Sequence, residues 1–129
     1  MTDRKTGAEK AEAGKIGEVA AGQYLHDNGY LIQGKNYRVG RFEVDLIALK
    51  EKTLIFIEVK TRTSELFGYP EEAVTYQKEN NIRKASGAYL HQTKYQGEIR
   101  YDIIAVILDR ALNVKSIFHI EDAFFPGPW

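Results

Sequence analysis

Four consecutive large apolar residues, 54–57, stand near the middle of the chain and are followed by Glu58 and then Val59. Because alternate residues of a strand point to opposite faces, such a run predicts a β-strand that is covered on both sides. A second apolar segment, 42–49, precedes it, and the polar segment 50–53 lies between the two. Together they predict an antiparallel hairpin with a four-residue loop at the centre of the fold.

The register of this hairpin decides which charged side chains meet. If the last apolar residue of the first strand lies opposite the first of the second strand, then Asp45 lies opposite Glu58. In the same register Glu43 lies opposite Lys60, and all four side chains share one face of the sheet. Two carboxylates so close repel by on the order of 3–4 kcal/mol at an effective dielectric constant of about 20. A shared proton, the nearby lysine or a divalent cation would offset this repulsion.

Two interpretations of these charges follow. Glu-x-Lys is common on strands, where it usually belongs to a solvent-exposed edge. At the end of a strand covered on both faces, a functional site is the better explanation. In that interpretation Asp45 and Glu58 hold Mg²⁺ together with water and substrate phosphate, which is the ligand set this cation prefers. Lys60 then positions or deprotonates a water, or stabilises charge on the phosphate.

The composition is that of a soluble globular protein with one domain: the chain has 129 residues, of which 43% are hydrophobic and 28% are charged. We expect a flexible segment at 1–8, one domain at 9–125 and a C-terminal tail at 126–129. No apolar run approaches the ~20 residues that span a bilayer, and residues 1–15 lack the apolar core of a signal peptide. We therefore expect no membrane association and a cytoplasmic location.

Cysteine and histidine usage excludes several kinds of site. The chain contains no cysteine and three scattered histidines, so disulfides and thiolate chemistry are excluded and a structural zinc site is not indicated.

The charge is balanced, with 18 basic and 18 acidic side chains, which argues against tight nonspecific binding of nucleic acid. The balance is compatible with an acidic metal site surrounded by a local basic rim. Candidates for that rim are Arg38, Arg41, Lys60, Arg62, Lys78, Arg83 and Lys84.

The remaining elements follow from periodicity and from turn residues. We expect a helix from about Ala8 to His26, a strand over 30–38, a helix from Pro70 or Glu71 to about Leu90, and strands over 99–108 and 114–120. With the hairpin, this gives the order αβββαββ. A crossover helix that follows a hairpin predicts an α/β fold with a mixed central sheet flanked by helices.

Some positions within these elements have two interpretations. Glu18 is either a surface charge, which its spacing favours, or a site residue beside a helix face of small residues. Lys78 interrupts the apolar stripe of the second helix, and it either extends to solvent or points toward the carboxylates. The aromatic residues at 124, 125 and 129 either cover the core or contact a partner. In the first helix we expect the inward stripe to consist of Ile16, Val19, Ala20 and Tyr24.

The sequence pattern resembles known families. Asp45 followed by Glu58-Val59-Lys60, in this order of elements, resembles the PD-(D/E)xK nuclease superfamily and its restriction-endonuclease-like fold. The span 14–124 is similar to the YraN family of small, largely uncharacterised bacterial proteins, which are related to Holliday junction resolvases. The matching stretches lie within 17–25, 29–30, 36–38, 43–48, 56–62, 70–78 and 101–106.

The resemblance implies a set of site residues. Asp45 and Glu58 hold Mg²⁺ or Mn²⁺, and Lys60 assists the attacking water. Glu18 becomes a site residue that orients water or a second metal, and Lys78 gains support as a phosphate contact. The expected set also contains Glu43 as a catalytic acid and Arg38 and Arg62 as substrate-binding residues. One departure is that the family usually has glycine immediately before the matching Glu43, where this chain has Phe42.

Two classes of function follow from the resemblance. The first is a metal-dependent nuclease that hydrolyses DNA phosphodiester bonds, with branched DNA as the resolvase-like substrate. The second is a noncatalytic DNA- or protein-binding module of the same fold that acts in DNA recombination or repair. We expect DNA as the partner, and a homodimer or a protein partner in DNA processing are further expectations.

Overall fold

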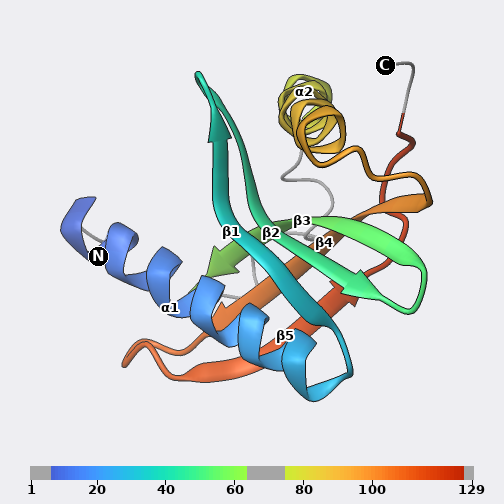
Figure 1. The fold of residues 1–129 in the computed structure, drawn as a ribbon. Coiled ribbons are helices and arrows are strands. Elements are labelled where there is room, and N and C mark those ends of the chain that lie inside the picture. Colours follow the sequence, from blue (N-terminus) through green and yellow to red (C-terminus); the bar gives the residue numbers. More distant parts are fainter. Residues whose placement is uncertain (1–6, 64–74, 127–129) are drawn as a thin grey trace.

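The computed structural model describes residues 7–63 and 75–126 and is an α/β protein with one five-stranded sheet (Figure 1). The elements are α1 Gly7–Asp27, β1 Leu31–Val39, β2 Phe42–Lys50, β3 Thr53–Arg62, α2 Tyr76–Thr93, β4 Glu98–Leu108 and β5 Val114–Ile120. This order confirms the predicted αβββαββ arrangement of the described residues. None of the helices in the described ranges is long and apolar enough to cross a membrane.

The sheet is mixed and follows the sequence order β1-β2-β3-β4-β5. β3 and β4 are parallel, and the other neighbouring strands are antiparallel. Alternate residues of β3 enter two different apolar clusters. Ile55 and Ile57 pack with α1, whereas Leu54 and Phe56 pack with α2. The two helices therefore cover opposite faces, as predicted for a strand buried on both sides.

The central hairpin has the predicted register but a shorter loop. Leu49 pairs with Leu54, as expected, and Lys50 pairs with Thr53. The loop consequently contains only two residues rather than four, and its first residue, Glu51, adopts a positive φ of 56°. A positive φ in a two-residue loop matches the twist of the flanking strands, which lets the polar residues at both ends join the ladder.

The register is the one expected, but the backbone ladder does not extend to Asp45 and Glu58 or to Glu43 and Lys60. The ladder between β2 and β3 ends one step earlier, at Leu46 and Ile57. Beyond that point the Asp45 carboxylate accepts a hydrogen bond from the backbone N–H of Val59 at 2.8 Å. Where the backbone ladder stops, the Asp45 side chain thus replaces a backbone carbonyl as the acceptor for the Val59 N–H.

The buried face of α1 differs from the predicted stripe. The buried residues are Ala13, Gly17, Ala21 and Leu25, spaced by four, and Val19 is 68% exposed. The other three predicted residues are partly buried at the margin of the cluster. The reason is close approach to β3: a Cβ added to Gly17 would lie 1.9 Å from Thr61 Oγ1. Small residues, rather than the large apolar ones, therefore determine which face turns inward.

α2 is capped at both ends. Thr75 is the N-cap, and its hydroxyl accepts a hydrogen bond from the Lys78 N–H at 3.2 Å. The helix continues three residues past the predicted end and stops at Thr93, where Lys94 takes the left-handed conformation. The predicted beginning at Pro70 or Glu71 lies outside the described residues.

Of the C-terminal aromatic residues, Phe124 covers the core. Its ring stacks on Tyr101 with centroids 4.9 Å apart, and the N–H of the preceding Ala123 donates to the Tyr101 carbonyl at 2.7 Å. Phe125 is 82% exposed. Residues 1–6, 64–74 and 127–129 lie outside the described residues. The last two residues of the expected flexible segment 1–8 belong to α1.

Candidate metal and phosphate site

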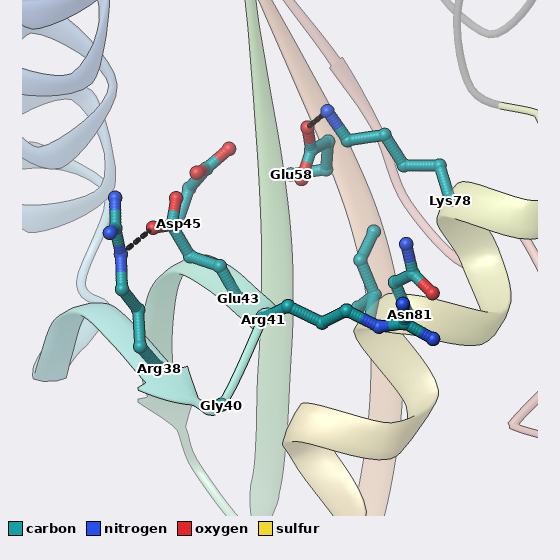
Figure 2. Close-up of a pocket in the computed structure, with 9 residues that line it drawn as sticks. Arg38, Gly40, Arg41, Glu43, Asp45, Glu58, Lys78 and Asn81 are labelled. Carbon is teal, nitrogen blue, oxygen red and sulfur yellow. Dashed lines mark hydrogen bonds and ion pairs between the residues drawn. The ribbon is translucent and has the colours of Figure 1, made fainter.

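A pocket of about 350 Å³ opens between the β1–β2 turn, strands β2 and β3, and helix α2 (Figure 2). Its lining combines three carboxylates with three basic side chains, and we call it the carboxylate pocket. The lining residues are Arg38, Gly40, Arg41, Glu43, Asp45, Glu58, Lys78, Asn81 and Ile82. Five of the eight predicted site residues, contributed by four different elements, therefore meet in one cavity.

Glu58 is the most deeply buried acid of the pocket, with a side chain that is only 4% exposed. Its Oε1 lies 2.7 Å from Lys78 Nζ and 3.6 Å from Lys60 Nζ. A buried carboxylate requires such a partner, because leaving it unpaired would cost several kcal/mol. Lys78 therefore points toward the carboxylates and not to solvent, which decides between its two interpretations (Figure 2).

Asp45 lies among other acids without a directly paired cation in the described residues. Burial and then the charge of Glu58 raise its pKa to about 8, and a hydrogen bond with Glu43 and the charge of Glu18 add to this shift. The Val59 N–H opposes the shift. The Asp45 carboxyl therefore keeps a proton near neutral pH in the protein without metal, which relieves the repulsion between the acids.

The two lysines beside Glu58 differ in ionisation. Burial lowers the pKa of Lys60, and so do the hydrogen bond and the positive charge of Lys78, while Glu58 acts in the opposite direction. Burial also acts to lower the pKa of Lys78, but its contacts with Glu58 outweigh burial and raise it. Lys78 therefore carries the charge that neutralises Glu58, and the Lys60 amine is the easier of the two to deprotonate.

The other predicted site residues lie around this centre. Glu43 forms an ion pair with Arg38, which also lines the pocket. Glu18 accepts a hydrogen bond from Asn36 Nδ2 at 2.6 Å, and its charge reaches Asp45 although it does not line the pocket. Arg62 donates to the Thr61 carbonyl at 2.9 Å and is not part of the lining.

Two polar lining residues were not among the predicted site residues. Arg41 occupies the two-residue turn between β1 and β2, and sequence reasoning counted it only as one of seven rim cations. Asn81 was missed altogether. Its signal was the spacing on α2, since three residues after Lys78 is nearly one helical turn and places Asn81 on the same side of the helix.

A second group of possible ligands lies elsewhere, on β4, on β5 and directly after β5. Asp102, His119 and Glu121 offer ligand atoms within 4.8 Å of one another, and they form the one group of this kind in the described residues. The sequence gives no signal for this group, because Asp102 lies 17 positions before His119 and 19 before Glu121, which is no recognisable ligand spacing.

The hydrogen bonds of Asp102 argue against a cation in that group. Its two oxygens accept two bonds from Arg100 at 2.8 Å, one from His119 Nε2 at 2.7 Å and one from the Asp122 N–H at 3.0 Å. Burial acts to raise the pKa of Asp102, but the His119 and Arg100 bonds outweigh it and lower the pKa. With its lone pairs used and a guanidinium beside it, this acid anchors β4 to β5 and does not suit a metal ion.

In the carboxylate pocket, by contrast, Asp45 and Glu58 are the residues that could hold a hard divalent cation. Asp45 and Glu58 offer carboxylate oxygens, the ligand type that Mg²⁺ and Mn²⁺ prefer. The proton held on Asp45 and the ammonium of Lys78 on Glu58 indicate how much negative charge the site must balance. A bound cation would perform the same task.

The fold and the site define an α/β protein with a mixed sheet and a carboxylate–lysine pocket between its central hairpin and the crossover helix. The chain belongs to the uncharacterised protein family UPF0102, whose model matches residues 17–106. This confirms the likeness to the YraN family that the sequence pattern indicated.

Curated relatives agree with this assignment. The UPF0102 protein of Bacteroides thetaiotaomicron is 45% identical over 119 residues, which are 92% of this chain and 97% of the relative. That of Phocaeicola vulgatus is 42% identical over 122 residues, covering 95% and 99% of the two chains. The UPF0102 protein of Caldanaerobacter subterraneus is 42% identical over 117 residues, covering 89% and 96%. None of these names gives an activity, so function has to be argued from the site.

Proposed function

We propose that this protein is a divalent-metal-dependent nuclease that hydrolyses DNA phosphodiester bonds. The observation that supports it most is the convergence of Asp45, Glu58 and Lys78 in one pocket, with Lys60 beside Glu58. A module that only binds phosphate gains nothing from three carboxylates, because they repel the phosphate backbone. Acids that would hold a cation, next to an amine that is easily deprotonated, suit hydrolysis.

Asp45 and Glu58 would hold Mg²⁺ or Mn²⁺, each through a carboxylate oxygen. When bound, the ion supplies Lewis-acid stabilisation of the phosphate and a more acidic water. Asp45 is already oriented by the Val59 N–H on one oxygen. Glu58 would have to exchange its contact with Lys78 for the cation.

The basic residues would act on the substrate. Lys60 is 14% exposed and lies 3.6 Å from Glu58, a position from which its amine can orient or deprotonate the attacking water. Lys78, released from Glu58, would contact the phosphate as it gains charge. Arg38 and Arg62 remain the proposed substrate contacts, and Glu43 and Glu18 remain proposed site acids.

The second candidate is a noncatalytic DNA- or protein-binding module in recombination or repair. The observation in its favour is that Lys78 already neutralises Glu58, so the site needs no metal to be stable. The overall charge of zero also suits a protein that receives its substrate from a partner.

The test is cleavage of labelled single-stranded, duplex, flapped and four-way DNA in Mg²⁺ and in Mn²⁺. Wild type is compared with Asp45→Asn, Lys60→Met and the control Lys52→Gln, an exposed cation in the β2–β3 loop. We expect structure-dependent cutting that the first two variants lose and the control keeps. Preferential cutting of four-way DNA would identify the resolvase-like activity.

Two other outcomes contradict the nuclease. Cutting that persists in both site variants would identify a contaminating enzyme. If no DNA is cut although Mn²⁺ binding depends on Asp45, the noncatalytic module is the better explanation.

A further inference from the structure

The seven cations of the expected basic rim divide into two groups once their contacts are known. Five are engaged within the molecule. Arg38 pairs with Glu43, Lys60 and Lys78 with Glu58, Arg62 with the Thr61 carbonyl, and Arg83 with Glu79, Asn80 and the Phe125 carbonyl. Within residues 7–63 and 75–126, Arg41 and Lys84 make no hydrogen bond or ion pair. These two exposed cations are available to an external anion.

Arg41 and Lys84 are brought together by one aromatic ring. The Arg41 guanidinium carbon lies 5.4 Å from the centroid of the Phe42 ring, and Lys84 Nζ lies 5.1 Å from the same centroid. Each contact contributes about 0.5–1 kcal/mol at an exposed site. Phe42 itself packs on the apolar cluster beneath α2. A ring anchored in this way contacts both cations and so places them on the same part of the surface.

The position of this pair points to the kind of anion. Arg41 lines the carboxylate pocket, and Figure 2 shows its side chain extending from the β1–β2 turn toward α2. Lys84 follows Lys78 by six residues on α2, which corresponds to about 9 Å along a helix axis. The pair therefore lies beside the acids but separate from them. A ligand that contacts both the acids of the carboxylate pocket and the Arg41–Lys84 pair must carry at least two phosphates along an extended chain.

We propose that Arg41 and Lys84, positioned by Phe42, form a phosphate clamp that binds a nucleic-acid strand next to the reacting phosphodiester. The proposal deepens the proposed function, on which it rests, by assigning a second phosphate subsite and a polynucleotide rather than a small phosphate ester as substrate. It also gives a role to Phe42, the residue at which this chain departs from the usual glycine. That ring is the platform that holds the two cations at the mouth of the pocket.

The test measures binding of a fluorescently labelled DNA duplex to the full chain in Ca²⁺ and in EDTA, over a series of salt concentrations. The affinity of a protein for duplex DNA falls with salt with a slope of about 0.9 per phosphate contact. We expect the double variant Arg41→Gln/Lys84→Gln to lower this slope by about 2 and each single variant by about 1. The matched control Lys52→Gln removes one exposed cation at the other end of β2 and should leave the slope unchanged.

A third variant separates the clamp from a general charge effect. Phe42→Leu keeps both cations but removes the ring, so we expect a several-fold loss of affinity with an unchanged salt slope. Far-ultraviolet circular dichroism and the melting temperature show whether each variant folds as wild type does.

The outcomes distinguish this proposal from the proposed nuclease. If wild type cuts no DNA but binds it with the predicted change of slope, the clamp stands without the nuclease. If the double variant binds DNA with the wild-type affinity and slope, the clamp is overturned even when DNA is cut. If Lys52→Gln weakens binding as much as Arg41→Gln does, net charge and not the clamp determines the affinity, and the proposal also fails.

Discussion

Asp45 makes the stability of the protein without metal dependent on pH. Its folded-state pKa of about 8 lies above the ordinary value of 3.8, so between these values the folded state holds a proton that the unfolded state has lost. Stability therefore falls as pH rises through this window, by up to about 1.4 kcal/mol per pH unit. Asp45→Asn removes this dependence, and we expect the variant to be more stable than wild type at pH 8.

Urea unfolding in EDTA between pH 5 and pH 8.5 measures this effect. Asp27→Asn is the matched control, because Asp27 is exposed at the end of α1 and its side chain is 61% accessible. Parallel stability curves for Asp45→Asn and wild type would show that the Asp45 carboxyl has an ordinary pKa.

Lys78 competes with a metal ion for Glu58. Lys78→Met removes the ammonium that lies 2.7 Å from Glu58 Oε1. We expect the metal-free variant to be less stable by about 1–2 kcal/mol, since a buried carboxylate loses its nearest partner while the 42% exposure of the Lys78 side chain limits the loss. We also expect Mn²⁺ to bind several-fold more tightly, as calorimetry would measure. Lys52→Met, an exposed cation in the β2–β3 loop, should change neither quantity, and equal Mn²⁺ affinities of Lys78→Met and wild type would refute the competition.

At the scale of elements, the close contact between α1 and β3 depends on Gly17. In Gly17→Ala the new methyl group would meet Thr61 Oγ1 at 1.9 Å and Thr61 Cβ at 2.9 Å, so the helix must move away from the sheet. We expect a loss of about 1–3 kcal/mol, equivalent to roughly 3–10 °C in melting temperature.

A glycine on the same helix provides the control. A Cβ on Gly14 would meet nothing within 4 Å, so Gly14→Ala should stabilise α1 by roughly 0.5–1 kcal/mol. Thermal unfolding of both variants and of Gly17→Ala/Thr61→Ala measures the effect. If Gly17→Ala melts at or above the wild-type temperature, the contact is not tight.

The elements also show how far the sequence could be interpreted. Placing the last apolar residue of the first strand, Leu49, opposite the first of the second, Leu54, predicted the β2–β3 register. It did not predict where the ladder ends, since that depends on Asp45 accepting the Val59 N–H. The predicted buried face of α1 was wrong because it was chosen from the large apolar side chains. At Gly17 the short distance between α1 and β3 determines the packing instead.

The candidate site was predictable only in part. Asp45 and Glu58 lie on neighbouring strands joined by a short loop, so their proximity follows from local pairing. Lys78 and Arg41 reach the pocket from α2 and from a turn, and their directions depend on tertiary packing that periodicity does not specify. The Asp102–His119 contact joins two strands and has no signature in the spacing of its residues.

Across the whole molecule, we expect stability to be concentrated in β3 and β4. These strands are central and parallel, and their side chains contribute to both apolar clusters. Native-state hydrogen exchange should show the slowest amides at Ile55–Val59 and Ile103–Val106, with faster exchange in the edge strands β1 and β5. Protection in β1 or β5 equal to that of β3 would contradict this distribution.

The parallel pairing of β3 with β4 has a consequence for synthesis in the cell. Val59 pairs with Ile104, so the ribosome must add 45 more residues before β3 can acquire its second neighbour. At 5–20 residues per second this takes roughly 2–9 s. During that interval the nascent chain carries a hairpin whose most apolar strand has one open edge, the kind of surface that invites aggregation. The chain is therefore expected to depend on chaperone protection between the appearance of β3 and that of β4.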